Sequence, residues 1–456
     1  MITPKLIKKS WQGPGGMREV LIQATPIIIT QSSDTILMFT DRFLLSGESP
    51  IHMAAALSGG LTAFLSLTFF FGLLSQVNAL AGQFTGKKSP QEASLAAGQG
   101  ILLACLFAPF LYLTFPFAST FFEFCGHNGQ LLRLETDYYK ILVSASIITL
   151  LRCVFASYFS GIGKPMIIMK SALVGVLVNI PLTYCLIFGK AGLPQLGIVG
   201  AGIATVIAST LVLIILVTCF FRQKLRESHH THMAVRYNPD IMRALFKLGT
   251  PAGFEFALQV SGFNFFILIF TSAGSVAAAA VTITFSWELL SYLPMTGIQI
   301  AVVALSAKYI GMGQTQLAER TARNALRLAL LYSGSLAIFF LLMAPQLATV
   351  FTNGETNNIS EMAATMLRIA CIYMTFDAIH LVYAGVFKGA GDLIYPTCLT
   401  FAIFWGACLL AYIEIKHFDI HPIGIWSTFT GLIVLLGLLY YQRYRKGTWK
   451  SKKILN

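Results

Sequence analysis

Apolar residues fall along this chain in blocks of about 20 or more, the length that an α-helix needs to cross a hydrocarbon layer about 30 Å thick. Short polar segments separate the blocks, so we predict about twelve membrane-spanning helices. The blocks run over Val20–Leu45, Ile51–Ala81, Ala93–Phe117, Tyr138–Phe159, Met166–Phe188, Ile198–Phe221, Leu245–Ser272, Ala277–Ala307, Ala322–Thr352, Ala363–Phe387, Leu393–Ile415 and Ile423–Tyr441. The pattern predicts an all-α integral membrane protein with the lipid bilayer as its surroundings.

Composition and charge support the same class. The chain is 56% hydrophobic and only 11% charged, whereas soluble domains carry about 25% charged residues. Its net charge of +13 does not form one basic stripe, which argues against a nucleic-acid partner. Lys and Arg instead gather after even-numbered blocks, for example at Lys87, Lys164, Lys308 and Lys388. Cytoplasmic loops are enriched in these residues, so we expect both termini to be cytoplasmic.

The two halves of the chain resemble each other at nearly constant offset. Thr25-Pro26 matches Thr250-Pro251 at an offset of 225, and Phe159–Gly163 matches Phe387–Gly391 at an offset of 228. An even number of blocks separates the copies, so they share one orientation and a pseudo-two-fold axis should run along the membrane normal. We therefore expect two six-helix bundles: an N-terminal lobe over 1–221, a cytoplasmic inter-lobe loop over 222–244, and a C-terminal lobe with a basic cytoplasmic tail over 245–456.

The inter-lobe loop contains three clustered histidines, His229, His230 and His232. A metal site is conceivable there. Since no cysteine accompanies them in sequence, we favour a solvated loop.

Ionisable residues inside the apolar blocks are few. A charged side chain at a helix centre costs about 2.5–3.5 kcal/mol on insertion scales, so each should face a cavity or a partner. Asp34 and Asp41 are seven residues apart in the first block and share one helix face. The others are Arg152 in the fourth block, Glu255 in the seventh, Glu288 in the eighth, and Asp377 with His380 in the tenth.

These groups allow two interpretations. A buried carboxylate can take up and release a proton or bind Na⁺, and either ion would couple its flow to a conformational change. Alternatively, the charges form ion pairs or hydrogen bonds that hold helices together, for example Arg152 with a neighbouring acid. Both interpretations stay open for Asp34 and Glu288, whereas we favour a coupling role for Glu255 and Asp377.

Several motifs resemble the multidrug and toxic compound extrusion (MATE) family. They include Met38-Phe-Thr-Asp41, Val178-Asn-Ile-Pro181, Gly197–Thr205, Gly249-Thr-Pro251 with Glu255, and Asp377 ahead of Gly389-Ala-Gly-Asp392. The resemblance covers about Arg18 to Tyr441. It implies twelve helices in two pseudosymmetric lobes that export organic, often cationic and amphipathic, molecules in exchange for Na⁺ or H⁺.

The resemblance also implies roles for particular residues. Glu255 and Asp377 match the family's acids that bind the coupling cation in the C-terminal lobe, which makes them a candidate Na⁺ site. Asp41 matches the acid of the N-terminal lobe, with Asn179 and Thr205 as its polar neighbours. Thr183 departs from the pattern, because many relatives carry Asp or Asn there. Asp34, Glu288, His380 and Arg152 remain candidates for substrate contact or for support of the cation sites.

Our leading hypothesis is thus an efflux antiporter of the plasma (inner) membrane that works by rocking of its lobes around a central cleft. We expect no cofactor beyond the coupling ion, and a monomer. The alternative is a flippase of a lipid-linked precursor, which usually needs a strongly cationic cavity. An enzyme is not expected, because the sequence lacks HExxH, GxSxG and Walker motifs.

Overall fold

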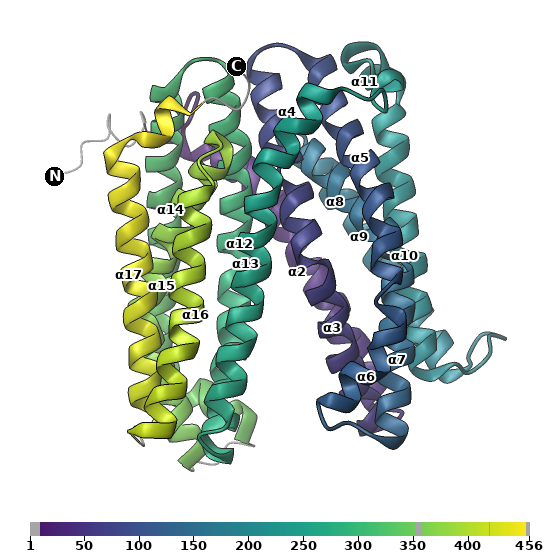
Figure 1. The fold of residues 1–456 in the computed structure, drawn as a ribbon, viewed down its shortest axis with the longest axis vertical. Helices are drawn as coiled ribbons and strands as arrows, with labels where there is room; N and C mark the ends of the chain where they lie inside the picture. Colours follow the sequence, from purple (N-terminus) through teal and green to yellow (C-terminus); the bar gives the residue numbers. More distant parts are fainter. Residues whose placement is uncertain (1–9, 353–357, 419, 453–456) are drawn as a thin grey trace. The chain divides into compact units, whose positions relative to one another are not determined.

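The computed structural model describes residues 10–352, 358–418 and 420–452, and within these ranges the chain is helical and contains no strand. The predicted all-α fold is therefore confirmed. The chain divides into two compact units, residues 26–253 and residues 254–456 together with those up to Thr25. Figure 1 labels their helices.

The first unit consists of packed helices with several breaks. Helix α3 packs against α7, α4 packs against α5 and α8, and α9 packs along α10. Its elements are most of α2 (Met17–Ser46), α3 (Pro50–Ser75), α4 (Val77–Gly86), α5 (Pro90–Tyr112), α6 (Phe115–Phe124), α7 (Gly129–Ser144), α8 (Ser146–Gly161), α9 (Pro165–Phe188), α10 (Gly197–Phe221), α11 (Gln223–His229), the 3₁₀ turn η1 (Thr231–Met233) and the start of α12 (Pro239–Thr271).

The second unit is built around α15, which packs against α13, α14 and α17 (Figure 1). It consists of the rest of α12, α13 (Ser275–Gly311), α14 (Thr315–Thr349), η2 (Val350–Thr352), α15 (Asn358–Ala390), α16 (Ile394–His417), α17 (Pro422–Lys446) and η3 (Thr448–Ser451). Ring contacts of Trp426 with Phe270, Phe285 and Phe429 fill its interior.

The boundaries of the units differ from the domains expected from the sequence. One boundary falls inside α2, between Thr25 and Pro26, and the other falls inside α12, between Gly253 and Phe254. The inter-lobe residues 222–244 belong to the first unit. The start of α2, up to Thr25, therefore belongs to the second unit. The start of α12, up to Gly253, belongs to the first unit.

The described residues contain ten helices that are long and apolar enough to cross a membrane, or eleven if α7 and α8 form one span bent by 47°. About twelve were expected. Helix α2 is not among the ten, because Gln31, Asp34 and Asp41 lower its hydropathy, although it is 30 residues long. The predicted block Tyr138–Phe159 is the bent pair.

The inter-lobe segment is folded and partly buried, not a uniformly solvated loop. Thr231 and Ala234 are 0% exposed. The hydroxyl of Ser94 donates to the carbonyl of His229 (2.7 Å), and Gln99 both donates to the carbonyl of Arg236 (2.9 Å) and accepts from the backbone N–H of Asn238 (3.2 Å). Within the described residues, no group of three or more His, Cys, Asp or Glu side chains is arranged to hold a metal ion.

A second anchored segment, residues 10–19, forms what we call the N-terminal strap of the second unit. Its Glu19 lies 3.4 Å from Lys308 and accepts from the hydroxyl of Tyr309. The amide of Asn324 donates to the carbonyl of Gly15 (2.8 Å), and a φ of +71° at Gly15 requires glycine. The strap is thereby fixed to α13 and α14.

Candidate ion-coupling sites

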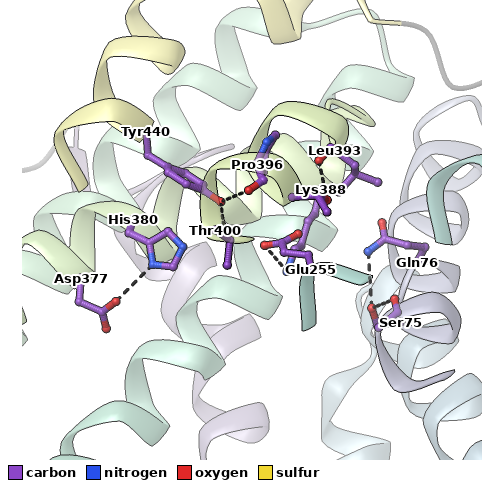
Figure 2. A network of polar contacts seen from close by, with 12 residues as sticks. Ser75, Gln76, Glu255, Asp377, His380, Lys388, Leu393, Pro396, Thr400 and Tyr440 are labelled. Atoms are coloured by element: carbon purple, nitrogen blue, oxygen red, sulfur yellow. Dashed lines mark hydrogen bonds and ion pairs between the residues drawn. The ribbon is translucent and has the colours of Figure 1, made fainter. Parts of the chain in front are cut away.

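Glu255 is the most buried of the candidate acids in the second unit. It lies on α12, four residues after Pro251, and is 2% exposed. Its Oε1 lies 3.3 Å from the ammonium of Lys388 in the last turn of α15 (Figure 2). Because a buried carboxylate without a positive partner or a proton is very costly, this ion pair explains how Glu255 is tolerated.

Asp377 pairs with His380 one turn further along α15. The Nδ1 of His380 lies 3.2 Å from Oδ1 of Asp377, and the ring packs edge-on against Tyr440 at 4.6 Å between centroids. The hydroxyls of Tyr440 and Thr400 lie 3.1 Å apart. Figure 2 marks this contact. Asp377 itself is 24% exposed, so this acid remains more accessible than Glu255.

Glu288 lies on α13 and accepts a hydrogen bond from the hydroxyl of Tyr373 on α15. Tyr373 in turn packs against Trp426 and Phe429. Glu288 therefore has a neutral partner within an aromatic cluster, and this contact links α13 to α15.

In the first unit, three helices bring polar groups around Asp41. The hydroxyl of Thr205 on α10 donates to Oδ2 of Asp41 (3.1 Å), and that of Thr183 on α9 donates to Oδ1 (3.3 Å). Oδ1 of Asn179 lies 3.3 Å from the Thr183 hydroxyl, and its Nδ2 is buried without a hydrogen-bond partner among the described residues. Asp41 is 6% exposed. The cluster presents hydroxyl, carboxamide and carboxylate oxygens in one buried place.

Asp34 lies elsewhere on α2, beside Arg152. The guanidinium of Arg152 on α8 lies 3.5 Å from Oδ1 of Asp34 and donates to the hydroxyl of Ser209 (2.9 Å). The ion pair considered for Arg152 is therefore present, and Asp34 is its acid.

Sequence reasoning missed three members of these networks. Lys388 was interpreted as a cation of a cytoplasmic loop, Thr183 only as a departure from the family pattern, and Tyr373 was not considered. The repeat contained a signal for Lys388, since Ser160 occupies the equivalent position of the first half. A charge present in only one copy of a repeat marks a position where the lobes differ in chemistry.

The two bundles of long apolar helices, with buried acids inside each, define a membrane transporter. A family model described as MatE matches residues 26–185 and 251–413, so its two segments begin at the repeated prolines Pro26 and Pro251. The match covers well over half of the chain. The protein belongs to the MATE family, as its motifs indicated.

Solved structures share this fold along the whole chain. A MOP superfamily transporter from Pyrococcus furiosus, described as having a binding pocket of reversed polarity, is 19% identical with a TM-score of 0.87, covering 99% of this chain and 100% of its own. A MATE transporter in a bent conformation is 18% identical with a TM-score of 0.86, covering 97% and 98%. An outward-facing multidrug resistance MATE transporter is 18% identical with a TM-score of 0.85, covering 98% and 99%.

Proposed function

We propose that this transporter exports organic, often cationic and amphipathic, compounds in exchange for Na⁺ or H⁺. The observation that carries the proposal is the Asp41 cluster. Its carboxylate is buried, receives hydrogen bonds from two neutral hydroxyls, and has no ion-pair partner among the described residues. A negative charge held in this way attracts a small cation that oxygen atoms can ligate, or a proton.

The acids of the second unit supply a distinct coupling element. Glu255 and Asp377 each have a basic partner, Lys388 and His380. A proton or Na⁺ that binds either acid changes the net charge of that acid–base pair. This change favours one conformation of the transporter over another only if the ion binds the two conformations with unequal affinity. In the proposed cycle, ion binding favours outward release of the organic compound, and the two lobes rock around a central cleft.

The charges of the described residues favour an exporter over a flippase of a lipid-linked precursor. A pyrophosphate head needs uncompensated cations, yet Arg152 lies beside Asp34 and His380 beside Asp377. Both mid-membrane bases are thus already paired with acids. Transport of a fluorescent lipid-linked precursor by the reconstituted protein, in the absence of organic-cation efflux, would reverse this choice.

Location and assembly are proposals as well. We propose a monomer in the plasma (inner) membrane with both termini cytoplasmic. In support, the first and last described segments reach the same end of the second unit: Arg320 in α14 donates to the carbonyl of Gln12, and Lys450 pairs with Glu319.

The decisive experiment measures efflux of a fluorescent organic cation from proteoliposomes under a Na⁺ gradient, then under a pH gradient, each with the other collapsed. Asp41→Asn, Glu255→Gln and Asp377→Asn should each lower ion-driven efflux while membrane insertion stays intact. Glu414→Gln is the matched control, because Glu414 accepts from the Thr428 hydroxyl in the second unit and has no assigned role. Wild-type efflux in all three acid variants, made singly and together, would refute ion coupling through these residues.

A further inference from the structure

Lys388 and Glu255 form a one-sided ion pair. The ammonium contacts Oε1 at 3.3 Å, whereas Oε2 is buried and has no hydrogen-bond partner among the described residues. Part of the carboxylate is thus left without a ligand in a place that is 2% exposed. A static structural ion pair gains most when both oxygens are satisfied, as in a bidentate arginine pair.

The charge balance makes Lys388 a competitor of any cation at Glu255. Within the described residues, Glu255 forms an ion pair with Lys388 and with no other basic side chain. One carboxylate and one ammonium together are neutral, so a second cation at Glu255 gains little attraction unless the ammonium leaves.

The internal repeat indicates that the two charges function as a pair. Under the repeat offsets given above, Thr30 stands at the position equivalent to Glu255, and Ser160 stands at the position equivalent to Lys388. The first half therefore lacks both charges at once. Asp41, a buried acid of the first half, has hydroxyl partners and, among the described residues, no lysine as ion-pair partner.

We propose that Lys388 is a tethered counter-ion of Glu255, which the coupling cation displaces when it binds the C-terminal lobe. This inference rests on the proposed role of Glu255 in coupling. Lys388 suits the task, because its side chain is 19% exposed and lies in the last turn of α15. An ammonium on a flexible four-carbon stem can move to water at modest cost. The lysine thereby sets the cation concentration at which the lobe responds.

The test uses the full-length protein in proteoliposomes and measures the half-saturating Na⁺ concentration at fixed pH, then the half-maximal pH at fixed Na⁺. Lys388→Gln removes the competitor and should lower the half-saturating cation concentration by about fivefold or more. Lys388→Arg should raise it, because a guanidinium pairs with a carboxylate through two hydrogen bonds.

Arg443→Gln is the matched control. Arg443 lies 3.0 Å from Asp392, and the exposures of these side chains, 21% and 3%, nearly equal the 19% and 3% of Lys388 and Glu255. Asp392 also lies 3.8 Å from Lys452, so it keeps one basic neighbour in this variant. The half-saturating concentration should stay at the wild-type value when this ion pair is removed.

The outcomes separate the two proposals. If Glu255→Gln keeps wild-type cation dependence, the coupling role of Glu255 is wrong. If Glu255→Gln abolishes that dependence but Lys388→Gln leaves the half-saturating concentration unchanged, the counter-ion role alone is overturned. If Lys388→Gln does not insert, Lys388→Arg decides, since it retains the charge: an unchanged half-saturating concentration in that variant also overturns the proposal.

Discussion

Gly98 of α5 allows the inter-lobe segment to dock, and replacing it by alanine should release that segment. A Cβ at this position would lie 1.6 Å from the carbonyl oxygen of Ala234 and 2.4 Å from its carbon. Ordinary van der Waals contact begins near 3.4 Å, so the backbone must retreat by about 1.8 Å, the difference between these distances. Both atoms belong to the turn backbone of Ala234, so neither can rotate aside as a side chain could.

The magnitude follows from the contacts beside the clash. Gln99 holds the segment through hydrogen bonds of 2.9 and 3.2 Å to Arg236 and Asn238, and a retreat of that size breaks both. Each bond contributes about 0.5–1.5 kcal/mol, so the docked state loses about 1–3 kcal/mol. The undocked population should rise about 5- to 150-fold.

Limited trypsin digestion of the protein in detergent measures this population, because cleavage follows the open fraction when reclosing is fast. The segment offers cleavage sites at Arg222, Lys224, Arg226 and Arg236. Gly98→Ala should be cut there at least about fivefold faster than wild type. Gly406→Ala should match wild type, because a Cβ at Gly406 meets nothing within 4 Å. A Gly98→Ala rate equal to that of the control would refute the docking.

Three further outcomes are expected. Thr183→Val removes a hydroxyl from the Asp41 cluster and should raise the half-saturating cation concentration by about 2- to 10-fold, measured by cation-driven efflux. Burial, and then a neighbouring lysine, lower the pKa of His229 below its ordinary 6.5, so the docked segment favours the neutral ring. Docking of the inter-lobe segment should be complete above pH 6.5 and weaken as pH falls below it. The measurement is amide hydrogen exchange of the segment, corrected for the pH dependence of the intrinsic exchange rates, and exchange should become faster as pH falls. Tyr309→Phe removes the hydroxyl of α13 that donates to Glu19 and accepts from the backbone N–H of Gly15, and it should speed tryptic cleavage of the N-terminal strap.

Each of these has a control and a contradicting result. Thr282→Val removes a hydroxyl that bonds only within its own helix, at Ala278, and should leave coupling unchanged; equal shifts in both threonine variants would contradict a special role for Thr183. His229→Gln should abolish the pH dependence, and its persistence would assign the effect to another group. Tyr332→Phe, on α14 of the same unit, should leave cleavage of the strap at the wild-type rate.

The hydropathy pattern predicted most of the helices but not their ends. Helix α12 begins at Pro239 and α14 at Thr315, six and seven residues before the apolar blocks that predicted them. These extra turns are polar and lie outside the apolar window, so hydropathy cannot detect them. The 47° bend between α7 and α8 has no signal either, because Ala145 and its serine neighbours include neither proline nor glycine.

The candidate residues were partly predictable for a similar reason. Asp377 and His380 are three residues apart on one helix, and this spacing alone predicts their contact. Family motifs named Asp41, Asn179 and Thr205, which the structure brings together from three helices. Lys388 could not be placed in this way, because a lysine at a helix end resembles a cytoplasmic loop cation whether its side chain extends to water or reaches back to an acid.

The boundaries inside α2 and α12 have a consequence for how this protein can be divided. A half-transporter expressed from residue 222 onward would contain the second copy of the repeat but lack residues 10–25, which belong to its compact unit and include Glu19 and Gly15. A fragment ending at residue 221 would likewise lose the residues up to Gly253 that complete the first unit. The repeated segment therefore does not coincide with the compact unit, and we expect split versions of this transporter to be more stable when they are cut at the ends of the compact units than at the ends of the repeats.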